Sequence, residues 1–181
     1  MSKEILRKRL INLRKTKYTN QSISYVQLKK ILKRFKFKKN LIIGGYYPIN
    51  NEIGSLEILK KLENNNFRIS LPITKKKNIM NFYEWSFKDP LRSSQRGIPE
   101  PYKKNKVLPD ILLVPLVGFD KNKFRLGYGG GFYDRYISKL SKLKNVLTIG
   151  FAFPFQEIEK IPVNKFDQQL DFILTNNKII R

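Results

Sequence analysis

The chain has 181 residues and carries 37 Lys and Arg against 14 Asp and Glu, a formal net charge of +23 at pH 7. It holds no cysteine and no histidine, which excludes a disulfide framework, a thiol nucleophile, a structural zinc site and the Ser-His-Asp type of nucleophile activation. No stretch approaches the roughly 20 apolar residues of a membrane span, and the first ten residues lack the apolar region of a secretory signal, so we expect one cytoplasmic domain over residues 1–181.

The first expected element is a helix over residues 2–17, because its leucines recur at helical spacing. Lys3 and Arg7 lie four positions apart on one face of this helix. Two cations so placed could grip a phosphate, but from these residues alone a solvated basic face is the better interpretation. A second helix, capped by Thr19, is expected to turn four apolar side chains inward, Leu28, Ile31, Leu32 and Phe35.

A strand–helix–strand unit is predicted next. Its parts are a buried strand at residues 41–47, a helix at 56–62 capped by Ser55, and a second strand at 67–71 that Pro72 stops. The loop between the first strand and the helix contains Glu52. This order of elements predicts a right-handed crossover between parallel strands.

A polar turn then leads into an aromatic run at residues 79–87, which we expect to be extended. Three of its side chains, Met80, Phe82 and Trp85, could wall a pocket for a flat heterocycle, although ordinary core packing is the better interpretation of them alone. Residues 89–109 hold four prolines and no strong periodicity, which is typical of a lid or a binding loop.

The stretch most informative about function follows. It predicts an apolar strand at residues 111–119, a charged turn, glycines at 127, 129, 130 and 131, and a helix. Glycines let a ligand approach the backbone, and the start of a helix adds free N–H groups, so together they make a phosphate site. Arg125 lies at its mouth, and Asp134, one turn inside the helix, could hold a metal ion. The helix is predicted from side chains at helical spacing, Phe132, Tyr136, Leu140 and Leu143.

The same loop could be a tight connection that merely needs glycine. Four glycines flanked by an arginine and an acid favour phosphate binding instead. The loop is not a Walker P-loop, because no Gly-Lys-Ser/Thr follows it, and Phe132 stands where G-x-G-x-x-G needs its third glycine.

The remaining chain predicts a strand at residues 146–151 and short strands at 172–174 and 178–180, with Asp171 just before the first of these. The expected fold is a three-layer α/β single domain, with a mostly parallel central sheet and helices on both faces. Ligands of such sheets lie beyond the carboxyl ends of the strands, which is where the glycine loop falls.

Residues 125–135, RLGYGGGFYDR, resemble the signature of the 5-formyltetrahydrofolate cyclo-ligase family, also called methenyltetrahydrofolate synthetase. The preceding VPLVGFD, the GIPEP at 97–101, the Lys3-x-x-x-Arg7 pair and the segment from Tyr47 to Glu52 fit the same family in order and spacing. The resemblance implies an ATP-dependent ring closure, in which the formyl oxygen of 5-formyltetrahydrofolate attacks the γ-phosphate of ATP. Folate nitrogen 10 then attacks the activated carbon, phosphate leaves, and 5,10-methenyltetrahydrofolate forms. The lack of histidine fits this route, because the reacting groups belong to the substrates.

Carried over by position, the resemblance also implies the site residues. The catalytic residues would be Lys3, Glu52 and Arg125. ATP would be bound by Lys3, Arg7, Arg125, Leu126, Gly127, Tyr128, Gly129, Gly130, Gly131, Phe132 and Tyr133. Mg²⁺ would be held by Asp134 and Asp171, and the folate by Tyr47, Glu52, Met80, Phe82, Trp85 and Glu100. The chain departs from the family at Phe166, where histidine is frequent, which leaves Asp167 without an assigned role, and at Phe132, where tyrosine is frequent.

Other functions remain open. The net charge could mark a nucleic-acid-binding domain or a protein for an anionic substrate, but the lysines are scattered in short runs, which favours compositional drift and a solvated surface. The alternatives are therefore a basic nucleic-acid-binding domain, another ATP-dependent ligase or kinase on the same scaffold, and a family member that folds without turning over. We expect a monomer with no specific nucleic-acid partner and no membrane association.

Overall fold

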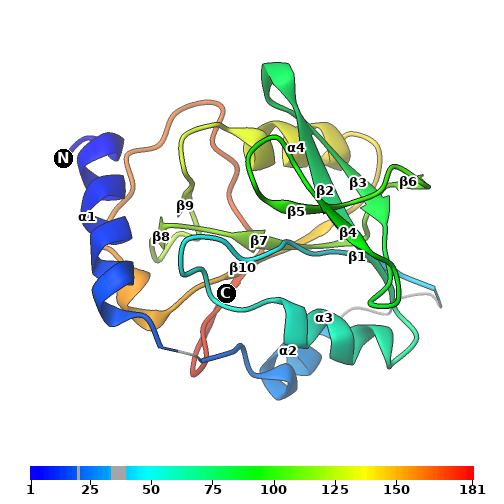
Figure 1. Cartoon of the computed structure of the whole chain (residues 1–181). Coiled ribbons are helices and arrows are strands. Elements are labelled where there is room, and N and C mark those ends of the chain that lie inside the picture. Colours follow the sequence, from blue (N-terminus) through cyan, green and yellow to red (C-terminus); the bar gives the residue numbers. More distant parts are fainter. Residues whose placement is uncertain (20, 34–39) are drawn as a thin grey trace.

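The computed structural model describes residues 1–19, 21–33 and 40–181, so the predicted inward position of Phe35 lies outside the described residues. The centre of the fold is one eight-stranded sheet in the order β12-β11-β10-β7-β1-β2-β3-β6 (Figure 1). Its mutually parallel strands are β1 (Ile42–Gly44), β2 (Arg68–Lys75), β7 (Ile111–Pro115), β10 (Leu147–Phe151) and β11 (Phe172–Leu174). Toward the two ends of the sheet the pairing is antiparallel, between β2 and β3 (Ile79–Glu84), between β3 and β6 (Lys106–Val107), and between β11 and β12 (Ile179–Ile180). The predicted α/β fold with a mostly parallel sheet is confirmed.

Helices cover both faces of this sheet (Figure 1). On one face, α2 (Tyr25–Leu32) and α3 (Leu56–Glu63) share a core with Ile111 and Leu113 of β7. On the other face, α4 (Phe132–Ser141) packs against Leu112 and Val114 of the same strand. β7 is therefore buried on both sides, and this is why its sequence is a continuous apolar run rather than an alternating one.

The first helix, α1 (Lys3–Lys17), has a different role. It packs beyond the carboxyl end of β7, beside a small hairpin of β8 (Gly118–Phe119) and β9 (Arg125–Leu126). The shared cluster is formed by Leu6, Leu10, Val117, Leu126 and Ile161. This packing brings the N-terminal turns of α1 to the end of the sheet where ligands of parallel sheets bind.

Several predicted strand ends were wrong, including that of the first strand, which was predicted to run to residue 47 but ends at Gly44. The run at 111–119 is not one strand, because β7 ends at Pro115 and the chain then turns into the β8–β9 hairpin. Nor does Pro72 stop β2. The pairing of β2 with β1 ends at Ser70, and beyond it Pro72 pairs with β3 opposite Phe82, so no neighbour on the β1 side needs a donor from the proline nitrogen.

Residues 89–109 are more regular than predicted. They contain a hairpin of β4 (Leu91–Ser93) and β5 (Pro99–Pro101), followed by β6. Leu143, which was predicted to belong to the helix, lies after the end of α4 and is 61% exposed. Within the described ranges, no helix combines the length and the apolar character needed to cross a membrane.

Candidate active site

A cavity of about 1050 Å³ opens beyond the carboxyl ends of the parallel strands. Tyr46 and Tyr47, which follow β1, form part of its wall, together with Thr74 of β2 and Pro115 at the end of β7. The glycine loop, residues 127–131, and the first turns of α4 form another side. The structure thus places the loop at the strand ends where the sequence predicts a ligand.

The glycine loop has a backbone that few other residues could adopt. Gly129 has a φ of +102° and Gly131 a φ of +62°, both in the region that strains L side chains. Gly131 is the N-cap of α4, and no side chain caps this helix start, so its first N–H groups stay available to an anion. Arg7 lies against the loop, because its Nε donates to the Gly127 carbonyl at 2.8 Å.

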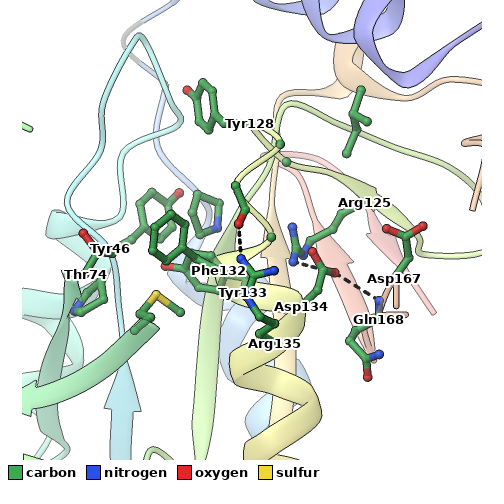
Figure 2. Close-up of a pocket in the computed structure, with 18 of the residues that line it drawn as sticks. Tyr46, Thr74, Arg125, Tyr128, Phe132, Tyr133, Asp134, Arg135, Asp167 and Gln168 are labelled. Carbon is green, nitrogen blue, oxygen red and sulfur yellow. Dashed lines mark hydrogen bonds and ion pairs between the residues drawn. The ribbon is translucent and has the colours of Figure 1, made fainter. Parts of the chain in front are cut away.

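Arg125 and Asp134 meet beside this loop (Figure 2). The Nη2 of Arg125 lies 2.9 Å from Asp134 Oδ1, an ion pair whose geometry does not make a hydrogen bond. The Arg125 side chain is 4% exposed, and its Nε is buried with no hydrogen-bond partner in the described part of the chain. A buried guanidinium with unused donors is costly unless an anion meets it. The arrangement therefore fits an anionic ligand such as a phosphate.

Lys3 reaches the same cavity from the start of α1. Its Nζ lies 2.5 Å from Asp167 Oδ2, and both residues line the cavity. The Asp167 carboxylate is itself fixed by the Asn164 N–H at 2.6 Å. Asp167, which had no role from the sequence, thus positions Lys3. Phe166 beside it also lines the cavity and is 70% exposed.

Glu52 is a buried carboxyl group in the cavity wall, 6% exposed. It accepts a hydrogen bond from the Ile49 N–H at 3.0 Å. Desolvation raises the pKa of Glu52 to about 7, although this hydrogen bond, the charge of Arg14 and hydrogen bonding from the Tyr128 hydroxyl each lower it. Near neutral pH Glu52 therefore has both ionisation states within reach and can accept or release a proton.

Two aromatic residues in the first turn of α4 also line the cavity. The Tyr133 hydroxyl is buried and has no hydrogen-bond partner among the residues that the structure describes. Burial raises the pKa of Tyr133, so this hydroxyl stays a neutral donor. The guanidinium of Arg96 lies 4.8 Å from the centre of the Phe132 ring, which brings a further cation to the cavity.

Asp134 is the residue best placed to bind a metal ion near the loop. Its Oδ1 accepts from the Gln168 N–H at 3.2 Å and faces Arg125, so both contacts leave Oδ2 for a cation (Figure 2). The described residues hold no group of three or more side chains that could form a complete metal cage. Mg²⁺ needs no such cage, because one carboxylate, substrate phosphates and water suffice. Asp134 fits that mode of binding.

Asp171 does not join Asp134, which corrects the predicted metal pair. It precedes β11, which runs parallel to β10, so it lies at the amino ends of these strands and outside the cavity. Its Oδ2 accepts from the N–H and hydroxyl of Thr148 at 2.7 and 2.8 Å. The carboxylate thus links β10 to the segment before β11.

The predicted aromatic wall is only partly present. Met80 lines the cavity, but Phe82 is fully buried in the core beside Tyr136, with ring centres 5.0 Å apart. Trp85 packs on Phe87 at 4.6 Å and belongs to the core on the other face. Both are core residues, Phe82 within β3 and Trp85 just after the end of that strand. Tyr47 and Glu100, the other predicted folate contacts, line the cavity.

Arg14 was not predicted as a site residue. It lies on α1 and is 1% exposed. Its guanidinium donates to the Leu116 carbonyl at 3.3 Å and to the Tyr128 hydroxyl of the glycine loop. The sequence did contain one indication that Arg14 lies near the site: it shares a face of α1 with Lys3, Arg7 and the buried leucines.

The sequence model of the 5-formyltetrahydrofolate cyclo-ligase family matches residues 1–176. The 5-formyltetrahydrofolate cyclo-ligase of Haemophilus influenzae is 34% identical over 139 residues, which cover 73% of this chain and 74% of that protein. That of Mycoplasma pneumoniae is 30% identical over 180 residues, covering 97% and 99%. Among solved structures, a 5,10-methenyltetrahydrofolate synthetase of Aquifex aeolicus has a TM-score of 0.75 at 28% identity, covering 100% of this chain and 93% of that one. One from Mycoplasma pneumoniae has a TM-score of 0.72 at 26% identity, covering 98% and 100%.

Proposed function

This chain belongs to the 5-formyltetrahydrofolate cyclo-ligase family, and we propose that it uses ATP to close 5-formyltetrahydrofolate into 5,10-methenyltetrahydrofolate, releasing ADP and phosphate. One observation supports this most: the buried guanidinium of Arg125 has unused donors beside an uncapped helix start, in the same cavity as the protonatable Glu52. Arg125 and the helix start suit the phosphoryl group of ATP, and Glu52 suits the folate, whose nitrogen 10 closes the ring.

The cations have a direct role in this reaction. The formyl oxygen bonds to the γ-phosphorus of ATP as the bond to ADP breaks, and negative charge on the phosphoryl oxygens must be balanced. Lys3, Arg7 and Arg125 line the cavity where that charge would develop. Asp134 would hold Mg²⁺, which would supply further neutralisation of the phosphate charge. Arg125 and Lys3 are held by Asp134 and Asp167 respectively, so their positions are set before the ligand binds.

The second half of the reaction needs alignment and a proton acceptor. Nitrogen 10 bonds to the formyl carbon, the carbon–oxygen bond to phosphate breaks, and the nitrogen loses its proton. Glu52, with its pKa near 7, is suited to accept a hydrogen bond or the proton there. Tyr47, Met80 and Glu100 line the same cavity and would contact the folate. Positioning supplies much of the remaining rate enhancement.

The proposal includes a cytoplasmic monomer without a nucleic-acid partner. Sedimentation at several protein concentrations tests the oligomeric state. A salt titration of RNA binding tests the nucleic-acid alternative, which predicts a steep loss of affinity with salt.

The deciding assay uses the protein with 5-formyltetrahydrofolate, ATP and Mg²⁺, and follows the absorbance of the methenyl product. The proposal predicts that this product and ADP form in equal amounts. ATP consumption without the methenyl product would favour another ATP-dependent ligase or kinase, and no binding of ATP at all would rule the proposal out.

A further inference from the structure

Arg135 is a further arginine of the cavity wall, and it contacts the glycine loop directly. It lies in the first turn of α4, is exposed and lines the cavity. Its Nη2 donates to the Gly130 carbonyl (Figure 2). Its Nε donates a longer hydrogen bond, 3.5 Å, to the Asn78 carbonyl in the turn between β2 and β3. Arg135 therefore joins the glycine loop to a neighbouring part of the sheet.

Gly131 makes room for this contact. A Cβ at Gly131 would lie 2.9 Å from Arg135 Nη1, so the guanidinium lies where any other residue would carry its side chain. The φ of Gly131, +62°, also disfavours an L side chain. The guanidinium of Arg135 thus packs directly against the backbone of the loop.

A hydrogen bond to a carbonyl fixes the orientation of the whole peptide group. The peptide is planar and trans, so its C=O and its N–H point in opposite directions. Because Arg135 binds the Gly130 carbonyl, the N–H of Gly131 points away from Arg135. Arg7 of α1 acts in the same way, since its Nε donates to the Gly127 carbonyl and the N–H of the next residue points away from Arg7. Two arginines from two helices therefore set the directions of two N–H groups in the loop.

The N–H groups of this loop are available to a ligand. In the part of the chain that the structure describes, the N–H groups of residues 128–131 donate to no backbone carbonyl, and no side chain caps the start of α4. Successive free N–H groups form a concave site for an anion. We propose that Arg135 is a positioning residue, which holds the Gly130 carbonyl so that the Gly131 N–H is presented to a phosphoryl group of ATP. The identity of the ligand rests on the proposed function, but the hold on the loop does not.

Neither core packing nor charge alone accounts for Arg135. The residue is exposed, so its removal should leave the core intact. Its charge is not distinctive, because Lys139, one turn further along α4, is also exposed and lines the same cavity. Arg135 differs in its contact with the Gly130 carbonyl. Lys139→Met is therefore the matched control for Arg135→Met.

The first test measures the motion of the loop in the protein without ligand. The heteronuclear NOE of backbone amides reports mobility on the picosecond-to-nanosecond timescale. We expect the NOE of the Gly130 and Gly131 amides to fall in Arg135→Met and to keep its wild-type value in Lys139→Met. Thermal melts check that both variants are folded. An unchanged NOE in Arg135→Met would overturn the proposal.

The second test measures the binding of tripolyphosphate, a probe with phosphate groups but no base, by titration calorimetry. Arg135→Met should raise its Kd by about tenfold or more, because a hydrogen bond from the loop to a charged group is weakened. Lys139→Met should raise the Kd by no more than about fivefold, as expected for an exposed charge. Arg135→Lys keeps the charge but not the planar fork, so it should recover the affinity only in part. Wild-type affinity in Arg135→Lys would mean that the charge acts without positioning the loop, and would contradict the proposal.

The two tests separate this inference from the proposed function. If the wild type does not bind tripolyphosphate, the phosphate site is wrong and the presentation of the Gly131 N–H is overturned with it. If tripolyphosphate binds as expected but no methenyl product forms, the proposed function fails and the role of Arg135 stands. If Arg135→Met does not fold, Arg135→Lys carries both measurements, and an NOE and a Kd equal to those of the wild type would overturn the proposal.

Discussion

Arg125 Nη2 and Asp134 Oδ1 lie 2.9 Å apart, although one residue belongs to β9 and the other to the first turn of α4. The pair spans the glycine loop and joins its two ends. It keeps the guanidinium in place while its buried Nε has no partner among the described residues. The loop, the ion pair and the helix start together support the proposed binding of a phosphoryl group here.

Arg125→Ala should reduce kcat/KM by about a hundredfold or more, the usual loss when one donor of transition-state charge stabilisation is removed. Steady-state kinetics measures this, and a thermal melt checks that the variant is folded. Arg68→Ala is the matched control, because Arg68 pairs with Glu84 at 2.7 Å and does not line the cavity. Near-normal turnover of Arg125→Ala would show that the phosphates bind elsewhere.

Asp134 and Asp171 were predicted together as Mg²⁺ ligands, but their variants should differ in the Mg²⁺ concentration that activity requires. Asp134→Asn should raise the Mg²⁺ concentration for half-maximal activity by at least about tenfold, because it removes the charge of a ligand near the phosphates. Asp171→Asn should leave that concentration unchanged and lower the free energy of unfolding, since its carboxylate accepts two hydrogen bonds from Thr148. Equal effects on Mg²⁺ in both variants would contradict this placement of the metal.

Gly129→Ala should affect both the stability and the site. The backbone at φ +102° disfavours an L side chain, at a cost of about 1–2 kcal/mol, and the new Cβ would lie 3.4 Å from the Arg7 guanidinium carbon. Asn66→Ala, at a φ of +65° outside the cavity, should cost about 1 kcal/mol of stability alone. Titration calorimetry with ATP distinguishes the two variants, because only Gly129→Ala should weaken ATP binding. If both variants bind ATP as the wild type does, Gly129 does not contribute to the nucleotide site.

Glu52 should make stability depend on pH. Its pKa is raised from 4.5 to about 7 in the folded state, so the unfolded chain loses this proton first as pH rises. The stability of the wild type should therefore fall between pH 4.5 and about 7, by up to about 3 kcal/mol, and then level off. Below pH 4.5 the group contributes no such penalty.

Glu52→Gln isolates this effect because all other groups are unchanged. Urea unfolding at about pH 4 and about pH 8, on either side of this window, should show similar stabilities at the lower pH and a more stable variant at the higher one. A constant difference at both pH values would mean that the pKa of Glu52 is the same in the folded and unfolded states.

The sequence allowed the central features to be predicted, and the structure shows why. A continuous apolar run such as that of β7 arises in a strand covered on both faces, and glycines clustered before a helix are typical of a loop that binds phosphate. These are local patterns. Their location at the carboxyl ends of the strands follows from the topology of a parallel sheet.

The errors concern residues whose roles depend on three-dimensional placement. Met80 and Phe82 lie two apart on one strand, yet one lines the cavity and the other is covered by Tyr136 of α4. Asp167 and Asp171 lie four apart, but the chain between them leads away from the cavity to the start of β11. Arg14 was missed because a charge within a basic helix gives no sign of its burial.

A crystal structure of the protein with Mg²⁺, a non-hydrolysable ATP analogue and 5-formyltetrahydrofolate tests the central claim most directly. The account predicts the γ-phosphate against the N–H groups of Gly129–Gly131 and the Arg125 guanidinium, with the formyl group on the Glu52 side of the cavity. A triphosphate bound away from this loop would contradict it.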